Sequence, residues 1–354
     1  MKTNQSSRSF GSDNHASIHP QILQAIVDAN HDHAPSYGTD PLSQDLQTEI
    51  VKIFGPRAEG FLVFNGTGAN VTALKCLVKS YHSVIATEIS HLQMDECGAP
   101  EAIIGCKILT VPHVNGKLNI SDLERLVVRR GDQHSSQIGA LSLTQPTELG
   151  TCYEISELKN IIAWARAQGL KIHIDGARFT GAAHFLKTSL ADLSDDLGID
   201  ILSFGGTKNG LLFGELVIIF NEQLARDFRY IRKQCLQLPS KTRFMAAQFL
   251  TYFKNDLWRE IAAHSHEMAQ LLAQELKSQA GVEADFPVQS NAVFVTLPRT
   301  WIKTLKTQNF FYVWDEHTFQ CRLMTSWDTR TDDVHGFVAK VVELQQQNTN
   351  GDGQ

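Results

Sequence analysis

The stretch DILSFGGTKNGLLFGELVIIF, residues 200–220, holds two short apolar runs that are separated by a glycine-rich turn with one lysine, Lys208. The runs DILSF (200–204) and ELVIIF (215–220) are nearly continuously apolar, which is typical of strands buried on both faces. A lone lysine in such a turn is usually a solvated loop residue. Glycines on both sides also let a flat ligand come close to the amine, so the function of Lys208 depends on what else the chain brings to this turn.

Apolar runs of the same kind precede this stretch, and helical stretches separate several of them. The segments 121–130 and 154–169 are predicted helices, and 40–55 is a further one, with Asp40 as its N-cap and Gly55 at its end. The runs are SVIATE (83–88), CKILTVP (106–112), IGALSLTQ (138–145) and LKIHID (170–175). Alternating strands and helices predict an α/β fold with a mostly parallel sheet and helices on both faces.

The pattern changes after about residue 245. Long helices are predicted in 246–279, followed by three short strands and a closing helix in 331–347. The strands are NAVFVTL (291–297), FFYVWDE (310–316) and FQCRLMT (319–325). We therefore expect a large α/β domain (1–245), a smaller α+β domain (246–346) and a disordered polar tail (347–354), with the N-terminal segment (1–30) able to pack on the small domain.

Composition excludes several classes of protein. The net charge of −6, without a basic block, argues against nucleic-acid binding. No apolar run approaches the roughly 18–20 residues of a membrane span, and the N-terminus MKTNQSSRSF lacks an apolar signal region, so a cytoplasmic protein is expected. The six cysteines are scattered without a CxxC pair, so no zinc or other metal site is expected.

Three turns at predicted strand ends carry candidate chemistry, because ligands of open α/β sheets bind beyond the carboxyl ends of the strands. In FNGTGAN, residues 64–70, the residues Gly66, Thr67 and Gly68 follow a strand and open a helix. Free N–H groups and a hydroxyl at a helix start can hold a phosphate, and an ordinary tight turn is the alternative. The GxxxxGK[ST] spacing of a P-loop is missing.

The second turn is HIDGARF, residues 173–179, in which Asp175 ends a strand and Arg178 follows it. The carboxylate could hold a positively charged ring nitrogen and the guanidinium could grip an anion. A capping aspartate and a surface arginine are the alternative.

The third turn contains Lys208, whose amine could form a Schiff base with an aldehyde, and Thr207, which offers a hydroxyl to a phosphate. A phosphate cradle, a carboxylate and a lysine are together the three groups that hold pyridoxal phosphate.

The chain as a whole resembles the fold type I pyridoxal-phosphate enzymes, and most closely the low-specificity L-threonine aldolase family, in a wider group with β-eliminating amino-acid lyases. Each motif that carries the resemblance is short, but their order over most of the chain is specific. They are GSDNHASIHP (11–20), YGTDP (37–41), FNGTGAN (64–70), SHLQMDECGAPE (90–101), LTQPTELGT (143–151), HIDGARF (173–179), SFGGTKNG (203–210) and CRLMTSWD (321–328).

The resemblance implies roles around the cofactor. Lys208 would carry pyridoxal phosphate as a Schiff base, and Asp175 would pair with its pyridine nitrogen. The three residues Gly66, Thr67 and Gly68, together with Thr207, would bind the phosphate. His91 would stack on the ring and take part in catalysis, where the alternative is an ordinary core or surface histidine.

The resemblance also implies contacts to the substrate and to a second subunit. Ser12, Arg178 and Arg322 would hold the substrate carboxylate, with Arg178 also near the cofactor; a surface strand arginine is the alternative for Arg322. Tyr37 would lie at a subunit interface near the cofactor, or is a plain packing residue. Lys241 or Arg243 would reach the phosphate of a neighbouring subunit. A homodimer or homotetramer with shared active sites is therefore expected.

Glu148 marks a departure from the family pattern. Many threonine aldolases have a histidine near the substrate hydroxyl where this chain has LTQPTELG. A glutamate can accept a proton there only if its pKa is tuned. Nearby arginines would lower that pKa and burial would raise it, and the sequence leaves the direction open.

The resemblance implies a pyridoxal-phosphate lyase that cleaves L-β-hydroxy-α-amino acids such as threonine, allo-threonine or phenylserine into glycine and an aldehyde. A β-eliminating lyase on the same scaffold is the main alternative, and a non-catalytic protein that binds pyridoxal phosphate is a second. A plain nucleotide-binding module is disfavoured, because the chain lacks both the P-loop and the GxGxxG pattern.

Overall fold

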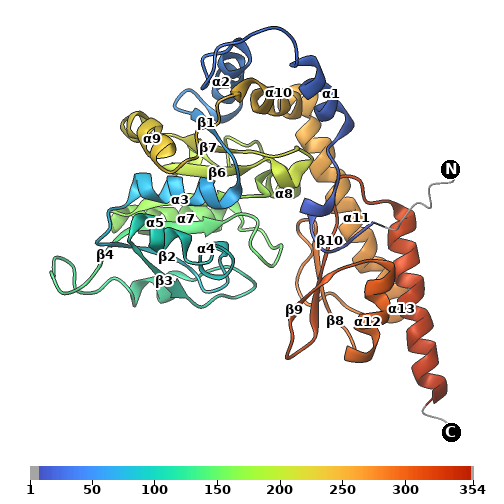
Figure 1. Cartoon of the computed structure of the whole chain (residues 1–354). Coiled ribbons are helices and arrows are strands. Elements are labelled where there is room, and N and C mark those ends of the chain that lie inside the picture. The colour runs from blue at the N-terminus through green and yellow to red at the C-terminus, as the bar shows by residue number, and fades with distance from the viewer. Residues whose placement is uncertain (1–7, 352–354) are drawn as a thin grey trace.

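The computed structural model describes residues 8–351, with side chains described to residue 347. Two sheets organise the chain (Figure 1). The strands of the large sheet are β1 (Glu59–Val63), β2 (His82–Thr87), β3 (Lys107–Val111), β4 (Gln137–Thr144), β5 (Lys171–Gly176), β6 (Ile201–Gly205) and β7 (Glu215–Ile219). The small sheet contains β8 (Ala292–Thr296), β9 (Tyr312–Asp315) and β10 (Gln320–Met324).

Helices pack on these sheets and connect their strands. The α-helices are α1 (Pro20–Asp28), α2 (Pro41–Phe54), α3 (Gly66–Leu77), α4 (His91–Met94), α5 (Ala99–Ile104), α6 (Ile120–Glu124), α7 (Ile155–Ala167), α8 (Phe179–Phe185), α9 (Glu222–Gln234), α10 (Thr242–Phe253), α11 (Leu257–Ala280), α12 (Arg299–Gln308) and α13 (Thr331–Gly351). The 3-10 turns are η1 (Asp13–His15), η2 (Asp195–Leu197), η3 (Thr207–Asn209) and η4 (Lys254–Asp256).

The large sheet has the order β1-β7-β6-β5-β4-β2-β3. From β3 to β6 every neighbouring pair is parallel, whereas β7 runs antiparallel to both β6 and β1. The small sheet is antiparallel, in the order β8-β10-β9. The predicted α/β class, with a mostly parallel sheet and a smaller α+β part, is therefore confirmed.

Both faces of the large sheet are buried, as its continuous apolar strands predict. In β7, Leu216 and Ile218 belong to one hydrophobic cluster, and Val217 and Ile219 belong to a second cluster on the opposite face. Side chains of α2, α7 and α10 complete the first cluster, and those of α3 and α9 complete the second. The helices therefore cover both faces, and the loops at the strand ends are left for chemistry.

The predicted helix over 40–55 is confirmed in α2, where the Asp40 carboxylate accepts the Ser43 N–H at 2.9 Å and Gly55 ends the helix with a φ of 104°. The helix predicted over 121–130 is much shorter, since α6 ends at Glu124. Beyond it the chain turns through Arg129 at a φ of 55°, a left-handed conformation that a helix cannot contain.

Helix α11 contributes to two hydrophobic cores. Its first turns place Leu257 and Ile261 in the core of the large sheet, and later turns place Leu272 and Leu276 in the core beneath the small sheet. Figure 1 shows this helix running from the large sheet to the small one. A break at η4, where Asn255 has a φ of 53°, separates α11 from α10.

The domain limits expected from the sequence stay predictions. The boundary after residue 245 falls inside α10, which packs into the core of the large sheet. Within the N-terminal segment, Phe10 is fully buried in the core of the small sheet, and its carbonyl accepts the Met324 N–H at 2.7 Å. Helix α1 of the same segment packs against α10. The expected tail from residue 347 begins within α13, and residues 1–7 and 352–354 lie outside the described residues.

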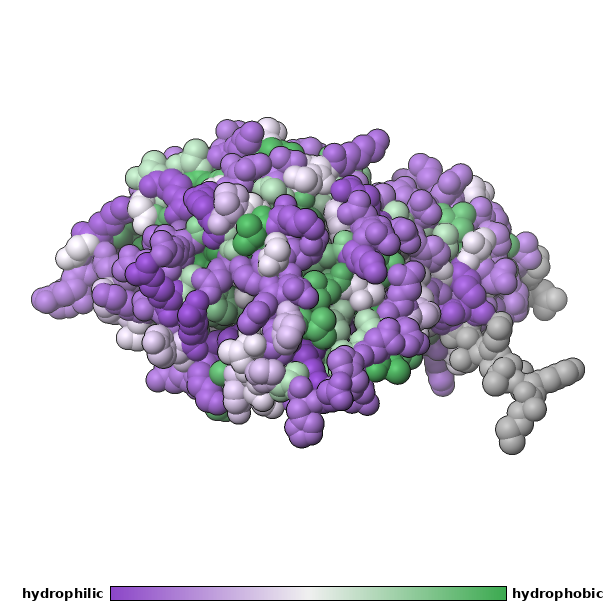
Figure 2. All heavy atoms as spheres, turned by 90° about the horizontal axis from the view of Figure 1, so that it is seen from above, coloured by the Kyte–Doolittle hydropathy of each residue, from purple (hydrophilic) through white to green (hydrophobic). Residues whose placement is uncertain are grey.

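The face of the molecule seen in Figure 2 is mostly hydrophilic, with small groups of apolar side chains between the polar ones. Leu23 and Val27 on α1 are among the exposed apolar residues. No helix within residues 8–351 combines the length and the hydrophobicity that a membrane-spanning segment requires.

The close approach of β5 and β6 gives a first testable prediction. A Cβ atom added at Gly205 would lie 2.0 Å from the Ala177 carbonyl oxygen, which is rigid backbone. We expect Gly205→Ala to lower the free energy of unfolding by about 2 kcal/mol or more, as over-packing does. The matched control is Gly181→Ala in α8, where the added Cβ meets no atom within 4 Å and should stabilise the helix by about 0.5–1 kcal/mol.

Denaturant titration of both variants measures these differences. An unchanged unfolding midpoint for Gly205→Ala would mean that the strand ends can separate to accept a side chain.

Candidate active site

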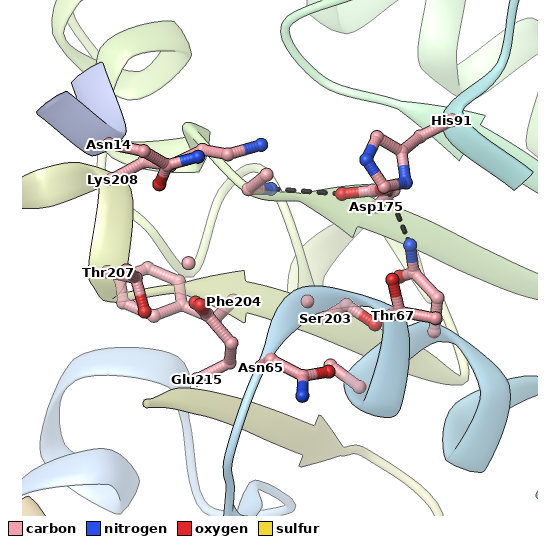
Figure 3. Close-up of a pocket in the computed structure, with 15 residues that line it drawn as sticks. Asn14, Asn65, Thr67, His91, Asp175, Ser203, Phe204, Thr207, Lys208 and Glu215 are labelled. Carbon is pink, nitrogen blue, oxygen red and sulfur yellow. Dashed lines mark hydrogen bonds between the residues drawn. The ribbon is translucent and has the colours of Figure 1, made fainter. Parts of the chain in front are cut away.

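A cavity of about 230 Å³ lies where the ends of β5 and β6 face the start of α3. Figure 3 shows Lys208 and Asn14 on one side of it, Asp175 and His91 on another, and Thr67 and Asn65 at the start of α3. The three turns singled out in the sequence therefore meet in one place, as the rule for strand ends in α/β sheets predicts.

Lys208 sits in η3, directly after β6. Gly206 before it has no room for a side chain, because a Cβ would lie 2.4 Å from the Gly214 carbonyl oxygen. Burial lowers the pKa of the Lys208 amine, and the positive charge of Arg178 lowers it further, against the opposing charges of Asp13 and Asp175. An amine that loses its proton more readily is a better nucleophile toward an aldehyde.

Asp175 is a buried carboxylate at the end of β5. Its Oδ2 accepts a hydrogen bond from Asn70 Nδ2 at 2.7 Å, and its Oδ1 accepts the Ala177 N–H at 3.0 Å. Two donors hold the carboxylate in one orientation, in which it lines the cavity. Such a fixed anion suits a positively charged ring nitrogen.

The start of α3 forms one wall of the cavity. The Asn65 side chain caps the helix by accepting the Gly68 N–H at 2.7 Å. Gly66 and Thr67 line the cavity, and the space beside the Gly66 Cα is open, with no atom within 4 Å of a Cβ position. Gly68 is not among the lining residues; it lies against Gln237, whose side chain would meet an added Cβ at 2.3 Å. The candidate anion cradle therefore consists of Gly66, Thr67 and the helix start.

Thr207 lines the cavity next to Lys208. Its hydroxyl accepts the Gly214 N–H at 3.1 Å and also hydrogen-bonds to Glu215, a buried glutamate that sequence reasoning did not find. Burial raises the pKa of Glu215 to about 7, and its carboxylate accepts the Gly206 N–H at 2.5 Å. Thr207 and Glu215 thus hold the lysine turn in shape.

His91 begins α4 and points into the cavity opposite Lys208 (Figure 3). Its Nδ1 lies 2.9 Å from Glu96 Oε1, and this hydrogen bond raises the pKa of His91 against the effect of burial. Glu96 also accepts a hydrogen bond from Asn70 at 2.8 Å. The buried Glu96 carboxylate therefore holds the predicted ring-stacking histidine, His91, through this hydrogen bond.

Glu148 lies beside His91. Its Oε1 accepts the Thr144 hydroxyl at 2.8 Å and the His91 backbone N–H at 3.1 Å, and its Oε2 is inaccessible and has no partner among the described residues. Burial raises the pKa of Glu148 to about 7, against these hydrogen bonds, and the charge of Asp175 adds to the rise. Burial therefore decides the direction of the Glu148 pKa shift, which the sequence left open.

Arg178 is already paired. Its Nε and Nη2 donate to the two oxygens of Asp13 at 2.5 and 2.9 Å, and Asn291 donates to the same carboxylate at 3.1 Å. A guanidinium has five N–H groups, so the edge formed by Nη1 and Nη2 stays available for a second anion. Ser12 accepts the Asn14 N–H at 3.2 Å and caps η1 beside this pair.

Arg322 on β10 lies between two aromatic rings, 5.0 Å from the Trp314 centroid and 5.9 Å from the Tyr312 centroid. Its Nε is inaccessible and has no partner among the described residues. Burial and the charge of Arg178 lower its pKa. A cation held by ring faces, with a donor left over, suits an incoming carboxylate.

Eight predicted site residues are not among those that line the cavity of this single chain, namely Ser12, Tyr37, Gly68, Glu148, Arg178, Lys241, Arg243 and Arg322. Three of them, Tyr37, Lys241 and Arg243, were expected to serve a neighbouring subunit. Tyr37 is exposed and donates its N–H to the Ser240 carbonyl at 2.9 Å, while Arg243 Nη1 donates to the His31 and Asp32 carbonyls at 2.8 and 3.1 Å. Lys241 is exposed just before α10. Their roles at a neighbouring subunit stay predictions.

Comparison with known proteins shows the family to which a chain with these site residues belongs. The profile of the beta-eliminating lyase family matches residues 9–298. The chain belongs to this family. A low specificity L-threonine aldolase from Pseudomonas sp. (strain NCIMB 10558) is 40% identical over 95% of this chain and 97% of its own length, and one from Pseudomonas aeruginosa is 41% identical over 92% and 94%.

A solved structure of a threonine aldolase from Leishmania major agrees with the fold at a TM-score of 0.90 and 31% identity, covering 96% of this chain and 99% of that one. The resemblance to the low-specificity L-threonine aldolase family is thereby confirmed. Membership in the beta-eliminating lyase family implies a pyridoxal-phosphate-dependent enzyme.

Several residues of this beta-eliminating lyase site escaped the sequence analysis. Asn70 and Glu96 lie inside the motifs FNGTGAN and SHLQMDECGAPE, in which the glycines and His91 carry the stronger sequence signals. Asn70 follows Gly66 by four positions, which places both on one side of a helix, and that spacing could have indicated it. Asp13 gave no signal, because its partner Arg178 is distant in the chain.

The raised pKa of Glu148 gives a second prediction. The folded value of about 7 lies above the ordinary value of 4.5, so the folded state keeps a proton that the unfolded chain loses as the pH rises from 4.5 to 7. Folding is therefore destabilised above pH 7 and unaffected below 4.5. We expect Glu148→Gln to be more stable than the wild type by roughly 1–3 kcal/mol at pH 8, and nearly equal at pH 4.5.

Unfolding titrations at the two pH values test this, with Glu124→Gln on the exposed face of α6 as the control. A gain in stability that is equal at both pH values would mean that packing, and not charge, distinguishes the two side chains.

Proposed function

We propose that this protein uses pyridoxal phosphate to cleave L-β-hydroxy-α-amino acids, with threonine or allo-threonine as the default substrate, into glycine and an aldehyde. The observation that carries the proposal is the meeting of Lys208, Asp175 and the start of α3 around one cavity. An amine of lowered pKa, a fixed buried carboxylate and a helix N-terminus are the groups that an aldehyde, a pyridine nitrogen and a phosphate require.

The residues around the cavity fit pyridoxal phosphate. Open space beside Gly66 lets a phosphate approach the N–H groups at the start of α3. Asp175 can accept a hydrogen bond from the pyridinium nitrogen while Asn70 and Ala177 keep it oriented. His91 lies opposite Lys208 and can cover one face of a ring between them. When bound, the cofactor supplies an aldehyde for amines and a ring that takes up the electrons of a breaking bond.

The arginines would position the substrate. Arg322 offers a guanidinium that has no carboxylate partner among the described residues, and Arg178 offers the edge that Asp13 leaves free. Two guanidinium groups on a carboxylate fix the orientation of the Cα–Cβ bond against the ring, which is catalysis by orientation. Asp13 and Asn291 keep Arg178 in place for this contact.

Glu148 is the proposed base. Its buried Oε2 has no partner among the described residues and would have to become accessible as substrate binds, and its pKa of about 7 lets the carboxylate take or release a proton near neutral pH. It would accept the proton of the β-hydroxyl as the Cα–Cβ bond breaks and the hydroxyl carbon becomes the aldehyde carbon. The backbone N–H of His91 and the hydroxyl of Thr144 hold the carboxylate for this transfer.

We also propose a homodimer or homotetramer in which neighbouring subunits complete each other's sites. Phe64 and Phe213 are both exposed and stack at 6.5 Å beside the turns that carry Asn65 and Lys208. Apolar surface next to a catalytic cavity suits burial by a second subunit. The exposed Tyr37 and Lys241 and the half-buried Arg243 would then serve a neighbour's cofactor. A cytoplasmic location remains part of this proposal.

The function is tested with the lysine that it depends on. The wild-type protein with added pyridoxal phosphate should develop a visible absorption band, and should convert threonine into glycine and acetaldehyde. We expect Lys208→Ala to lose the band and to lose activity by several orders of magnitude, because no other amine replaces the nucleophile. Lys107→Ala on the exposed edge of β3 is the control.

Each contrary outcome has a definite meaning. Ammonia and a keto acid in place of glycine and acetaldehyde would identify a β-eliminating lyase. A visible band without turnover of any β-hydroxy amino acid would identify a non-catalytic binding protein. A band and turnover that survive Lys208→Ala would overturn the cofactor assignment.

Arg322 gives a prediction about substrate capture. A lysine cannot replace the planar fork of a guanidinium, so we expect Arg322→Lys to weaken glycine and threonine binding by about 2–4 kcal/mol, as disruption of a desolvated charge contact does. The absorption band of the bound cofactor should be unchanged. Glycine titrations measure the affinity, with Arg299→Lys in α12 as the control. An unaltered affinity in Arg322→Lys would mean that Arg322 has only a structural role in its strand.

A further inference from the structure

Four side chains form one continuous hydrogen-bonded chain along the wall of the cavity, which three of them line. His91 Nδ1 lies 2.9 Å from Glu96 Oε1, Asn70 Nδ2 donates to the same oxygen at 2.8 Å, and Asn70 Nδ2 donates to Asp175 Oδ2 at 2.7 Å. Figure 3 shows the last of these contacts as a dashed line at Asp175. Asn70, Glu96 and Asp175 are buried, and His91 is half-buried.

The amide of Asn70 can take only one orientation in this chain. Its Nδ2 carries two N–H groups, and each of them points to a carboxylate. A flipped amide would place its carbonyl oxygen between Glu96 and Asp175, where both partners are acceptors. The unpartnered Oδ1 of Asn70 is thus the cost of bridging two anions.

We propose that Glu96 is a positioning residue, which acts through Asn70 and His91 so that the imidazole and the Asp175 carboxylate keep fixed orientations on the side of the cavity opposite Lys208. The inference rests on the proposed function only in placing a cofactor in contact with His91 and Asp175. The hydrogen-bonded chain itself exists in the protein without it.

Glu96 also fixes the protons of His91. An ionised Glu96 accepts the proton on Nδ1, which leaves Nε2 as the nitrogen on the other side of the ring. One nitrogen or carboxylate oxygen from each of His91, Glu96 and Asp175 lies within 4.8 Å of the others. Two carboxylates this close to an imidazole favour its charged form.

The charges around His91 agree with this role. The hydrogen bond to Glu96 raises the His91 pKa most, burial lowers it, Asp175 raises it and Lys208 lowers it. Glu148 contacts the His91 backbone through an N–H and not the ring. Removal of the Glu96 charge therefore leaves burial and Lys208 opposed mainly by Asp175, and the His91 pKa should fall.

The closing experiment follows the titration of His91 in the full-length protein without added cofactor. Histidine ring signals are recorded by NMR against pH, and the signal that disappears in His91→Asn assigns the residue. In Glu96→Gln the amide can place its oxygen where Oε1 lies and its NH₂ where the unpartnered Oε2 lies, so the shape is kept and the charge is lost. We expect the His91 midpoint to fall by about 1 pH unit or more.

A second variant, Glu96→Asp, keeps the charge but withdraws the carboxylate by one methylene; we expect it too to lower the midpoint, by less. The matched control is Glu101→Gln, a neighbouring glutamate on α5 that also has a buried oxygen without a partner and should leave the His91 midpoint unchanged. Folding of each variant is followed by circular dichroism, and Glu96→Asp decides the question if Glu96→Gln does not fold.

A His91 midpoint that is the same in Glu96→Gln as in the wild type would overturn the inference, as would an equal fall in Glu101→Gln. If Glu96→Gln does not fold, an unchanged midpoint in Glu96→Asp overturns it. If the wild-type protein cleaves no β-hydroxy amino acid, the proposed function fails while the titration still decides the role of Glu96.

Discussion

The hydrogen bond from Asn70 to Asp175 joins the two halves of the site. Asp175 ends the central strand β5, in register with Thr144 of β4 and Ser203 of β6. A carboxylate buried at this point is costly unless donors surround it, and the amide of α3 supplies one of them at 2.7 Å. The same contact fixes the start of α3 against the sheet, so the anion cradle and the lysine turn face each other at a set distance.

The side chains of Arg178, His91 and Arg322 differ in their partners. Arg178 forms an ion pair with Asp13, and His91 hydrogen-bonds to Glu96, whereas Arg322 rests on ring faces and has no carboxylate partner among the described residues. A desolvated cation without a partner is the group with most to gain from an incoming anion. The unpaired guanidinium of Arg322 therefore lies where the substrate carboxylate is proposed to bind, and the partners of Arg178 and His91 keep those two side chains in place.

The sequence predicted the site where single residues carry a local signal. Lys208 and Asp175 stand at strand ends, and Gly66 and Thr67 open a helix after a strand, so the topology of an α/β sheet was enough to bring them together. Gly68 was expected at the phosphate, but its N–H is consumed by the Asn65 cap. A helix start has several free N–H groups, and only geometry decides which of them a side chain takes.

Other parts could not be predicted, because they depend on contacts between distant segments. Asp13 meets Arg178, and Glu96 meets Asn70, only after the chain has folded. The length of α6 was overestimated, since an apolar pattern does not reveal the left-handed turn at Arg129. Tyr37 and Arg243 lie outside the cavity of the single chain, and their roles at a neighbouring subunit stay predictions.

Helix α11 has a mechanical consequence. Its 24 residues extend over about 36 Å, and both hydrophobic cores hold it along that length. If either hydrophobic core unfolded, α11 would lose the packing on part of its length, and the other core depends on the same helix. The two sheets are therefore coupled into one cooperative unit, in which Arg322 on the small sheet and Lys208 on the large one belong to a single stiff frame.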